Sequence, residues 1–478
     1  MQIVIPYSRR IIVVCILLAL ASAVMTVKIG LVLPLLVVVC CCGLIYSVFL
    51  LKNPAVGLYT TLAFCFLMPM LGRELDGMPF GIGVEVLLIG TWLAIIVKHR
   101  DYDWAVLKTD LMTLTAVWFI ISVLELFNPA GASVMGWLQE IRNAALHAML
   151  LIPLALLILS QKEARSINTV LWLFIGISVL AALNGYRQLK FLTPGEKLFL
   201  EEMASTHLIW GKLRVFSFYT DAGQFGASQA HILLITLILA VGPFKWWVKA
   251  LCAFCAMCLL VGMLISGTRG AFFVLFSGLF FSLILFKNFK ALVLGGLVMA
   301  LLIGFLKYTT VGSGNYQIAR LRTALDPEDA SLNLRFINQR RLSEYLKSRP
   351  FGGGLGVIGI WGHEYNSDKY LSTIEPDSYW VKVWAMYGIV GFIIWFCMMM
   401  YLFGKCGGII WRIENRGLKI KLVGLTAGAF GVFIASYGNE VINRVPSSLV
   451  VYMSFALVYL GPRFDRKLKE ANHPSKVV

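Results

Sequence analysis

The chain is dominated by a series of apolar runs, each of which is long enough to cross a membrane as a helix. A hydrocarbon core of roughly 30 Å requires about 17–25 apolar residues, and about fourteen runs of this kind recur along the sequence. They cover residues 11–27, 29–51, 54–71, 82–97, 109–127, 142–160, 168–186, 223–241, 248–265, 270–286, 289–306, 377–403, 418–437 and 444–461. The pattern predicts an all-α polytopic membrane protein with about 12–14 transmembrane helices.

Two polar segments are longer than the turns that join the other runs. Residues 187–222 form a medium loop, and residues 307–376 form a large loop that is rich in arginine. Within the large loop, apolar residues recur at helical spacing over 331–348, which predicts an amphipathic helix that ends before a proline. The chain therefore divides into a transmembrane bundle (1–306), the large loop, and C-terminal helices with a tail (377–478).

Composition and charge agree with this division and indicate an orientation. The sequence is 59% hydrophobic and only 14% charged, which is too little charge for a soluble domain. Lysine and arginine concentrate in every second connection and at both ends of the chain, so both termini are predicted to be cytoplasmic and the large loop to lie on the opposite face. The net charge of +17 follows from this topology, requires no nucleic-acid partner, and favours contact with anionic membrane lipids.

The ten cysteines do not form a metal-binding or disulfide pattern. All lie in or beside the apolar runs, and the large loop contains none. Cys252, Cys255 and Cys258 recur every three residues, but on an apolar helix such residues are expected to serve as small packing residues. We therefore expect no metal site.

Several arginines on the face of the large loop are candidate ligands for a pyrophosphate. Arg214 precedes a predicted helix, Arg269 lies in a short turn between two runs, and Arg335 and Arg341 lie in the loop helix. Guanidinium groups bind phosphate oxygens in bidentate fashion and keep their charge at any pH. Alternatively, each arginine snorkels to the interface or pairs with a carboxylate. The glycine-rich run 352–362 is a weak indication of phosphate binding, because glycine also permits tight turns.

Acidic residues on the same face are candidate acceptors for the proton of a reacting hydroxyl. Asp377 lies at the start of a run beneath the large loop, although it could equally be a helix N-terminal acid that complements the dipole. His363 is more typical of a surface loop residue. The other candidates on this face are Asp221, Glu375, Glu140 and Glu440.

Taken in order, these pieces resemble the O-antigen polymerase and O-antigen ligase superfamily of bacterial envelope glycosyltransferases, over about residues 205–400. The matching pieces are the Arg214–Gly223 stretch, Ser266–Gly270, Arg335 with its helix, Arg349–Gly356, and the run that opens Asp377-Ser378-Tyr379 and continues to Gly391.

The resemblance implies a bacterial inner-membrane enzyme that is similar to glycosyltransferases of the C type and uses no metal or other cofactor. It implies polymerisation of undecaprenyl-pyrophosphate-linked repeat units of O-antigen, capsule or exopolysaccharide on the periplasmic face, with the arginines holding the pyrophosphate. Asp377, His363 and Glu375 are the expected catalytic candidates, and Asp221 and Tyr379 are expected to contact the acceptor or the glycan. Ligases of the superfamily carry a His-Asn pair where this chain has Asp377-Ser378, which favours a polymerase.

Two alternatives stay open. One is an O-antigen ligase that transfers the glycan to lipid A–core or another acceptor. The other is a lipid-linked glycan flippase or transporter, for which internal repeats and broken or charged midplane helices would be expected; the sequence shows neither clearly. Membrane lipids, a chain-length regulator and a flippase are the candidate partners beside the lipid-linked glycan.

Overall fold

The computed structural model describes residues 32–75, 80–314, 316–323 and 330–472, and these form a bundle of helices. Within these described residues, ten helical segments are long and apolar enough to cross a membrane. They are α3 (Ala55–Glu74), α4 (Gly83–Val97), α5 (Asp110–Leu124), α6 (Val134–Ile141) continued through the π-helical turn η5 (Arg142–Leu146) into α7 (His147–Ser160), α8 (Ser166–Gln188), α11 (Ala222–Ala240), α12 (Trp246–Ile265), α18 (Tyr379–Arg412), α19 (Arg416–Ala435) and α20 (Ser447–Asn472).

The remaining described elements do not belong to these ten segments. Three further apolar helices are α2 (Val32–Lys52), α13 (Arg269–Leu285) and α14 (Phe289–Tyr308). The loops contribute α9 (Pro194–Glu202), α10 (Ala204–His207), an antiparallel pair of β1 (Leu208–Ile209) and β2 (Lys212–Leu213), α15 (Tyr316–Thr323), α16 (Ala330–Leu346) and α17 (Ile360–Tyr365). Short 3₁₀ turns are η1 (Phe80–Ile82), η2 (His99–Asp101), η3 (Trp104–Leu107), η4 (Glu125–Phe127) and η6 (Tyr370–Thr373).

These helices confirm the predicted all-α polytopic membrane protein. The predicted run 11–27 lies outside the described residues, as does the beginning of the run 29–51. Helix α16 occupies the part of the large loop in which a helix is predicted over 331–348.

Helix α11 lies at the centre of the bundle, with 94% of its apolar window buried. Helix α11 packs against α12, α13 and α19. A Cβ added to Gly226 would lie 2.2 Å from the hydroxyl of Ser266, so only a glycine allows this approach. Small residues at such interfaces let membrane helices pack closely. The first turns of α11 are therefore held against the turn that joins α12 to α13.

The long helix α18 is interrupted at Gly388, where φ is +67°. The amides of Gly353 and Gly354 donate to the carbonyls of Ala385 and Met386, at 2.9 Å each. These bonds satisfy carbonyls that the interruption deprives of helical partners. A Cβ added to Gly388 would lie 2.1 Å from a carbonyl of the large loop. The first glycines of the run 352–362 therefore anchor the large loop on α18 through close backbone contact.

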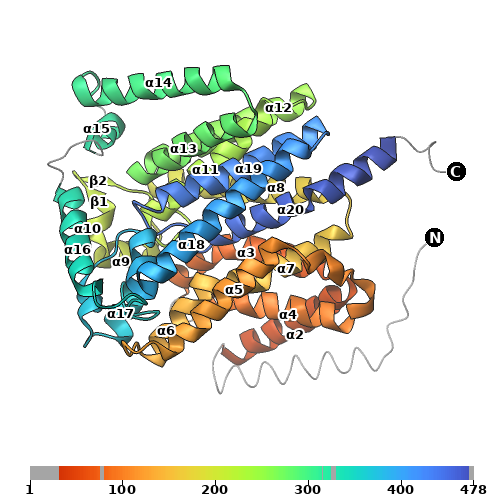
Figure 1. The fold of residues 1–478 in the computed structure, drawn as a ribbon, viewed down its shortest axis with the longest axis horizontal. Helices are drawn as coiled ribbons and strands as arrows, with labels where there is room; N and C mark the ends of the chain where they lie inside the picture. Colours follow the sequence, from red (N-terminus) through yellow and green to blue (C-terminus); the bar gives the residue numbers. More distant parts are fainter. Residues whose placement is uncertain (1–31, 76–79, 315, 324–329, 473–478) are drawn as a thin grey trace.

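The polar connections gather at one end of the bundle (Figure 1). Helices α9, α10, α16 and α17 lie at that end, and α18 and α20 end at the opposite one. Helices α3, α8, α12 and α19 end at the first of these, whereas α11, α13, α18 and α20 begin there. The ends of helices that are far apart in sequence are thus brought beside the large loop.

Candidate functional site

Three arginines from separate parts of the chain surround the turn between α12 and α13. Arg214 donates from Nη2 to the hydroxyl of Thr268 at 3.2 Å. Arg320, from α15, donates from Nε to the carbonyl of Gly267 at 3.4 Å. Arg269 donates from Nη1 to the last carbonyl of α15 at 3.0 Å. Arg214 and Arg269, both predicted as pyrophosphate ligands, therefore lie at one turn together with Arg320, which the sequence pattern does not indicate as a site residue.

The electrostatics of this arginine cluster (Arg214, Arg269 and Arg320) favour an anion. Burial lowers the pKa of the Arg214 guanidinium, and the nearby charges of Arg320 and Arg269 lower it further, while Asp221 offsets part of the effect. Like charges that crowd a partly buried site raise each other's free energy, and a bound anion relieves that repulsion.

The N-terminus of α13 adds to the positive field. Thr268 is the N-cap residue of this helix, but its side chain makes no capping hydrogen bond within the described residues. Its hydroxyl instead donates to the carbonyl of Ala222 at 2.9 Å and accepts from Arg214. A helix N-terminus carries unsatisfied amides and the positive end of the dipole, and both attract phosphate.

The connection between α19 and α20, residues 436–446, closes the other side of the cluster. A Cβ added to Gly223 would lie 2.6 Å from the side-chain nitrogen Nδ2 of Asn439. A Cβ added to Gly270 would lie 4.0 Å from the Cβ of Asn439. Asn439 therefore packs against the first turns of both α11 and α13. A single asparagine in a short connection has no sequence signature, so the sequence alone does not indicate Asn439 as a site residue.

Arg335 and Asp377 form a pair on the far side of this connection. Arg335 Nε lies 3.6 Å from Asp377 Oδ2, and the side chains are 29% and 44% exposed. Arg335 Nη1 lies 3.9 Å from the position of a Cβ added to Gly438. Asp377 has a backbone φ of +45°. Residues other than glycine rarely adopt this conformation, and it recurs at functional sites.

The other predicted residues lie elsewhere on the same end of the molecule. His363 Nε2 and Glu375 Oε1 are 2.8 Å apart and both side chains are exposed. Arg341 is exposed on α16, and within the described residues no hydrogen bond or ion pair ties its side chain to the cluster. Asp221 caps α11, accepting from the amide of Gln224 at 2.8 Å.

Tyr379 does not face this site. It is 3% exposed, and its ring packs edge-on against Trp395 at 5.5 Å between ring centroids. Its backbone amide donates to the carbonyl of Ser436 at 3.0 Å. This environment favours a packing role over the predicted contact with the glycan.

A buried cation ties the connection 436–446 to the bundle. Lys382 Nζ lies 3.0 Å from Glu140 Oε2 and 3.3 Å from Glu440 Oε2, and Arg444 Nη2 lies 3.4 Å from the same Glu440 oxygen. Burial alone would raise the pKa of Glu440, but Lys382 and Arg444 outweigh it and hold that pKa below its usual range. Charges inside a membrane bundle are expensive and are retained where they pair or function.

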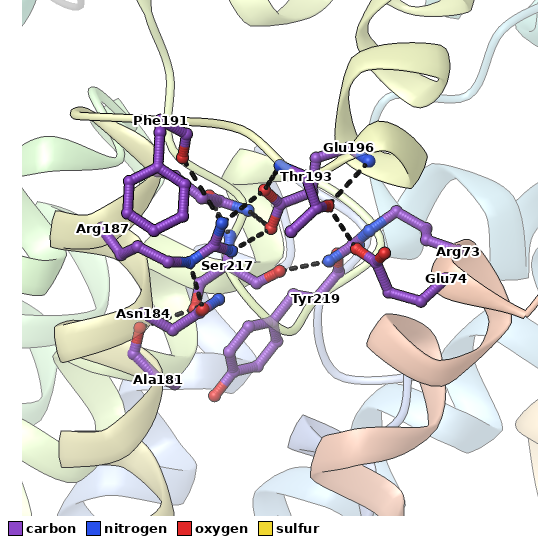
Figure 2. Close-up of polar contacts among 11 residues, drawn as sticks. Arg73, Glu74, Ala181, Asn184, Arg187, Phe191, Thr193, Glu196, Ser217 and Tyr219 are labelled. Atoms are coloured by element: carbon purple, nitrogen blue, oxygen red, sulfur yellow. Dashed lines mark hydrogen bonds and ion pairs between the residues drawn. The ribbon is translucent and has the colours of Figure 1, made fainter.

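A second polar network holds the segment that carries Arg214 (Figure 2). Arg73, at the end of α3, donates to the carbonyls of Ser217 and Tyr219. Arg187, from α8, forms a bidentate pair with Glu196, with Nη1 to Oε2 at 2.9 Å. Glu196 also completes the capping box of α9. Two helix ends and one loop helix therefore fix the backbone that follows Arg214.

These arrangements define what the site can do. The arginine cluster and the start of α13 offer positive charge and hydrogen-bond donors of the kind that bind a pyrophosphate, and Asp377 is an exposed carboxylate of the kind that accepts a proton. Among the described residues, no group of three or more His, Cys, Asp or Glu side chains is placed to hold a metal ion.

Comparison with known proteins relates part of the chain to one protein family. Residues 253–396 match the protein family described as O-Antigen ligase (Wzy_C). The matched range includes Arg269, Arg320, Arg335, Asp377 and Lys382. No curated protein matches the chain significantly. The chain is therefore a polytopic membrane protein that carries a domain of the O-antigen ligase family, a family of polysaccharide assembly.

Proposed function

We propose that this protein is an inner-membrane glycosyltransferase that polymerises undecaprenyl-pyrophosphate-linked oligosaccharide repeat units on the periplasmic face. The observation that carries the proposal is the arginine cluster at the N-terminus of α13. It offers charge-assisted hydrogen bonds and a helix dipole to the same ligand, and this combination suits a pyrophosphate.

In the proposed reaction, the bond between the anomeric carbon of the donor glycan and the pyrophosphate oxygen breaks. The electron pair leaves with undecaprenyl pyrophosphate, an acceptor hydroxyl oxygen bonds to the anomeric carbon, and its proton passes to a protein base. Guanidinium groups that already surround the leaving group stabilise the charge developing on it. The proposal therefore invokes no metal and no cofactor.

Asp377 is the best candidate for the base. It is 44% exposed and paired only loosely with Arg335, so an acceptor hydroxyl can reach it. Glu440 is less suitable, because Lys382 and Arg444 hold it as an ion-paired carboxylate. Asp221 is committed to capping α11, although its other oxygen remains available for a glycan hydroxyl.

Ligation is the second candidate function, because the matched family is described by that activity. A ligase transfers the whole glycan to lipid A–core or another acceptor, whereas a polymerase transfers it to the next repeat unit. Both reactions use the same donor and would use the same arginines. A flippase has no need of a base beside the pyrophosphate.

The test is an assay of the purified full-length protein with a synthetic lipid-linked repeat unit, with and without a lipid A–core acceptor. A ladder of longer lipid-linked products without core is the result expected of a polymerase. Product only in the presence of core would assign a ligase, and no product with either acceptor would refute glycan transfer. Arg269→Ala should abolish the ladder, whereas Arg340→Ala, a matched exposed arginine on α16, should not.

The proposed orientation has its own test. A cysteine at Ser343, which is exposed on α16, should react with a membrane-impermeant thiol reagent in intact spheroplasts. A cysteine at Arg416, at the opposite end of the bundle, should react only after lysis. The reverse pattern would place the arginine cluster on the cytoplasmic face and refute the proposal.

A further inference from the structure

The end of the bundle opposite the arginine cluster contains a cavity that the proposed reaction does not use. It lies between the last turns of α18 and the C-terminal part of α20, two helices that end together there (Figure 1), and has a volume of about 420 Å³. Its charged lining consists of four cations and one carboxylate: Lys405, Arg412, Arg466, Lys469 and Asp465.

Two of these cations and the carboxylate have partners. Lys405 Nζ lies 3.0 Å from Asp110 Oδ2, and Lys469 Nζ lies 2.8 Å from Glu414 Oε1. Asp465 is buried and accepts from the backbone amides of Glu414 and Asn415, at 3.3 and 2.9 Å. The carboxylate in the lining is thus occupied in holding the connection between α18 and α19.

The other two cations are arginines that face the same cavity from different helices. Arg412 and Arg466 are both exposed, and within the described part of the chain neither makes an ion pair. A helix C-terminus attracts one cation, and an arginine at a membrane surface snorkels. Neither effect explains why two guanidinium groups lie around one hollow that is already lined by two lysines.

The residues around the cavity are of the kinds found where a protein meets lipid headgroups. Trp411, which precedes the lining residue Arg412 in the chain, is 42% exposed, and Lys287 Nζ lies 4.6 Å from the centre of the Trp411 ring. Tryptophan with neighbouring cations is typical of the membrane–water interface. Ile409 and Ile413 give the same cavity an apolar wall.

We propose that this cavity binds the phosphate of an anionic phospholipid headgroup. Arg412 and Arg466 would bind the phosphate oxygens, while the isoleucine wall would contact the glycerol and the first carbons of the acyl chains. Basic pockets between membrane helices are known to hold such headgroups. A free phosphate has the same charge chemistry, but it makes no use of an apolar wall at the interface.

The test uses full-length protein in neutral detergent after removal of bound lipid. Phosphatidylglycerol, phosphatidylcholine and inorganic phosphate are titrated separately, and binding is followed by native mass spectrometry and by the thermal midpoint. Phosphatidylglycerol should bind saturably and raise the midpoint, and the other two should not. The double variant Arg412→Gln/Arg466→Gln should bind it at least about tenfold more weakly, because two charge-assisted hydrogen bonds are lost.

The matched control is Arg416→Gln/Lys419→Gln, which removes two positive charges from the start of α19 without altering the cavity lining. It should bind phosphatidylglycerol as the wild type does. Arg412→Lys/Arg466→Lys keeps the charge but loses the bidentate geometry. Its affinity for phosphatidylglycerol should therefore lie between that of the control and that of the Arg412→Gln/Arg466→Gln variant. Equal stabilisation by inorganic phosphate or by phosphatidylcholine would overturn the proposal, as would unchanged affinity in the Arg412→Gln/Arg466→Gln variant.

Discussion

The buried cation at Lys382 gives a prediction whose size follows from the structure. Lys382→Met keeps an unbranched side chain that is shorter by one atom but removes the charge that lies 3.0 Å from Glu140. The Glu140 side chain is only 1% exposed, so the variant leaves a carboxylate buried without a cation. Removing one partner of such a pair costs about 3–5 kcal/mol. Glu440 contributes less to the loss, because Arg444 remains beside it.

A second substitution separates the charge effect from a packing effect. Glu140→Gln in the Lys382→Met background removes the unpaired charge, so the double variant should recover at least about half of the lost stability, a coupling of roughly 2 kcal/mol. Arg463→Met is the control: its pair with Asp103 is 39% and 47% exposed, and pairs of that kind contribute about 1 kcal/mol or less.

The measurement is thermal unfolding of the variants in one neutral detergent, together with the rate of polymerisation. Lys382→Met should lower the midpoint by several degrees more than the control, and should slow turnover because Glu440 no longer fixes the connection 436–446. The reasoning fails if Lys382→Met is as stable as the control. It also fails if the double variant shows the full sum of the two single losses.

Three further outcomes are expected. Asp377→Asn should reduce polymerisation by about 10²–10⁴-fold while donor binding and the thermal midpoint change little. Arg269→Lys should be nearly as damaging to donor binding as alanine, because lysine loses the bidentate fork, whereas Arg340→Lys should have no effect; equilibrium binding of the lipid-linked donor measures both. Although burial raises the pKa of Glu196, its hydrogen bonds, above all to Arg187, lower it below the usual range. The stability from this pair is therefore present above about pH 4.3 and lost as pH falls through the lower folded pKa, so Glu196→Gln should flatten the acid side of the stability profile.

The helices could be predicted because their signal is local. An apolar run of span length specifies a membrane helix almost regardless of its neighbours. The apolar residues of the large loop recur at helical spacing, and this spacing predicts α16. The association of Arg214 with Arg269 could also be anticipated, since both lie where a run on the same face begins. What the runs did not indicate is how the connections pack across one another.

Three parts of the candidate site depend on contacts between segments that are far apart in the sequence, and the sequence alone does not show these contacts. Asn439 acts through contacts with α11 and α13, and nothing within its own connection indicates them. Lys382 did have a signal, because an ionisable residue inside an apolar run is a functional hypothesis by default. The sequence indicates Glu140 and Glu440 as separate candidate bases, and only the fold shows that Lys382 pairs with both.

The distribution of charge around the connection 436–446 bears on how such a site would choose its substrates. The arginine cluster lies on the Asn439 side and is built from tightly packed helix ends, so it suits the invariant pyrophosphate of the donor. Asp377 and Arg335 lie on the Gly438 side, where the side chains are partly exposed and the neighbouring loop helices present polar residues. Groups that contact only phosphate cannot distinguish one sugar from another. Under the proposed function, the sugar would therefore be selected on the exposed side, by α16, α17 and the segment that leads into α18.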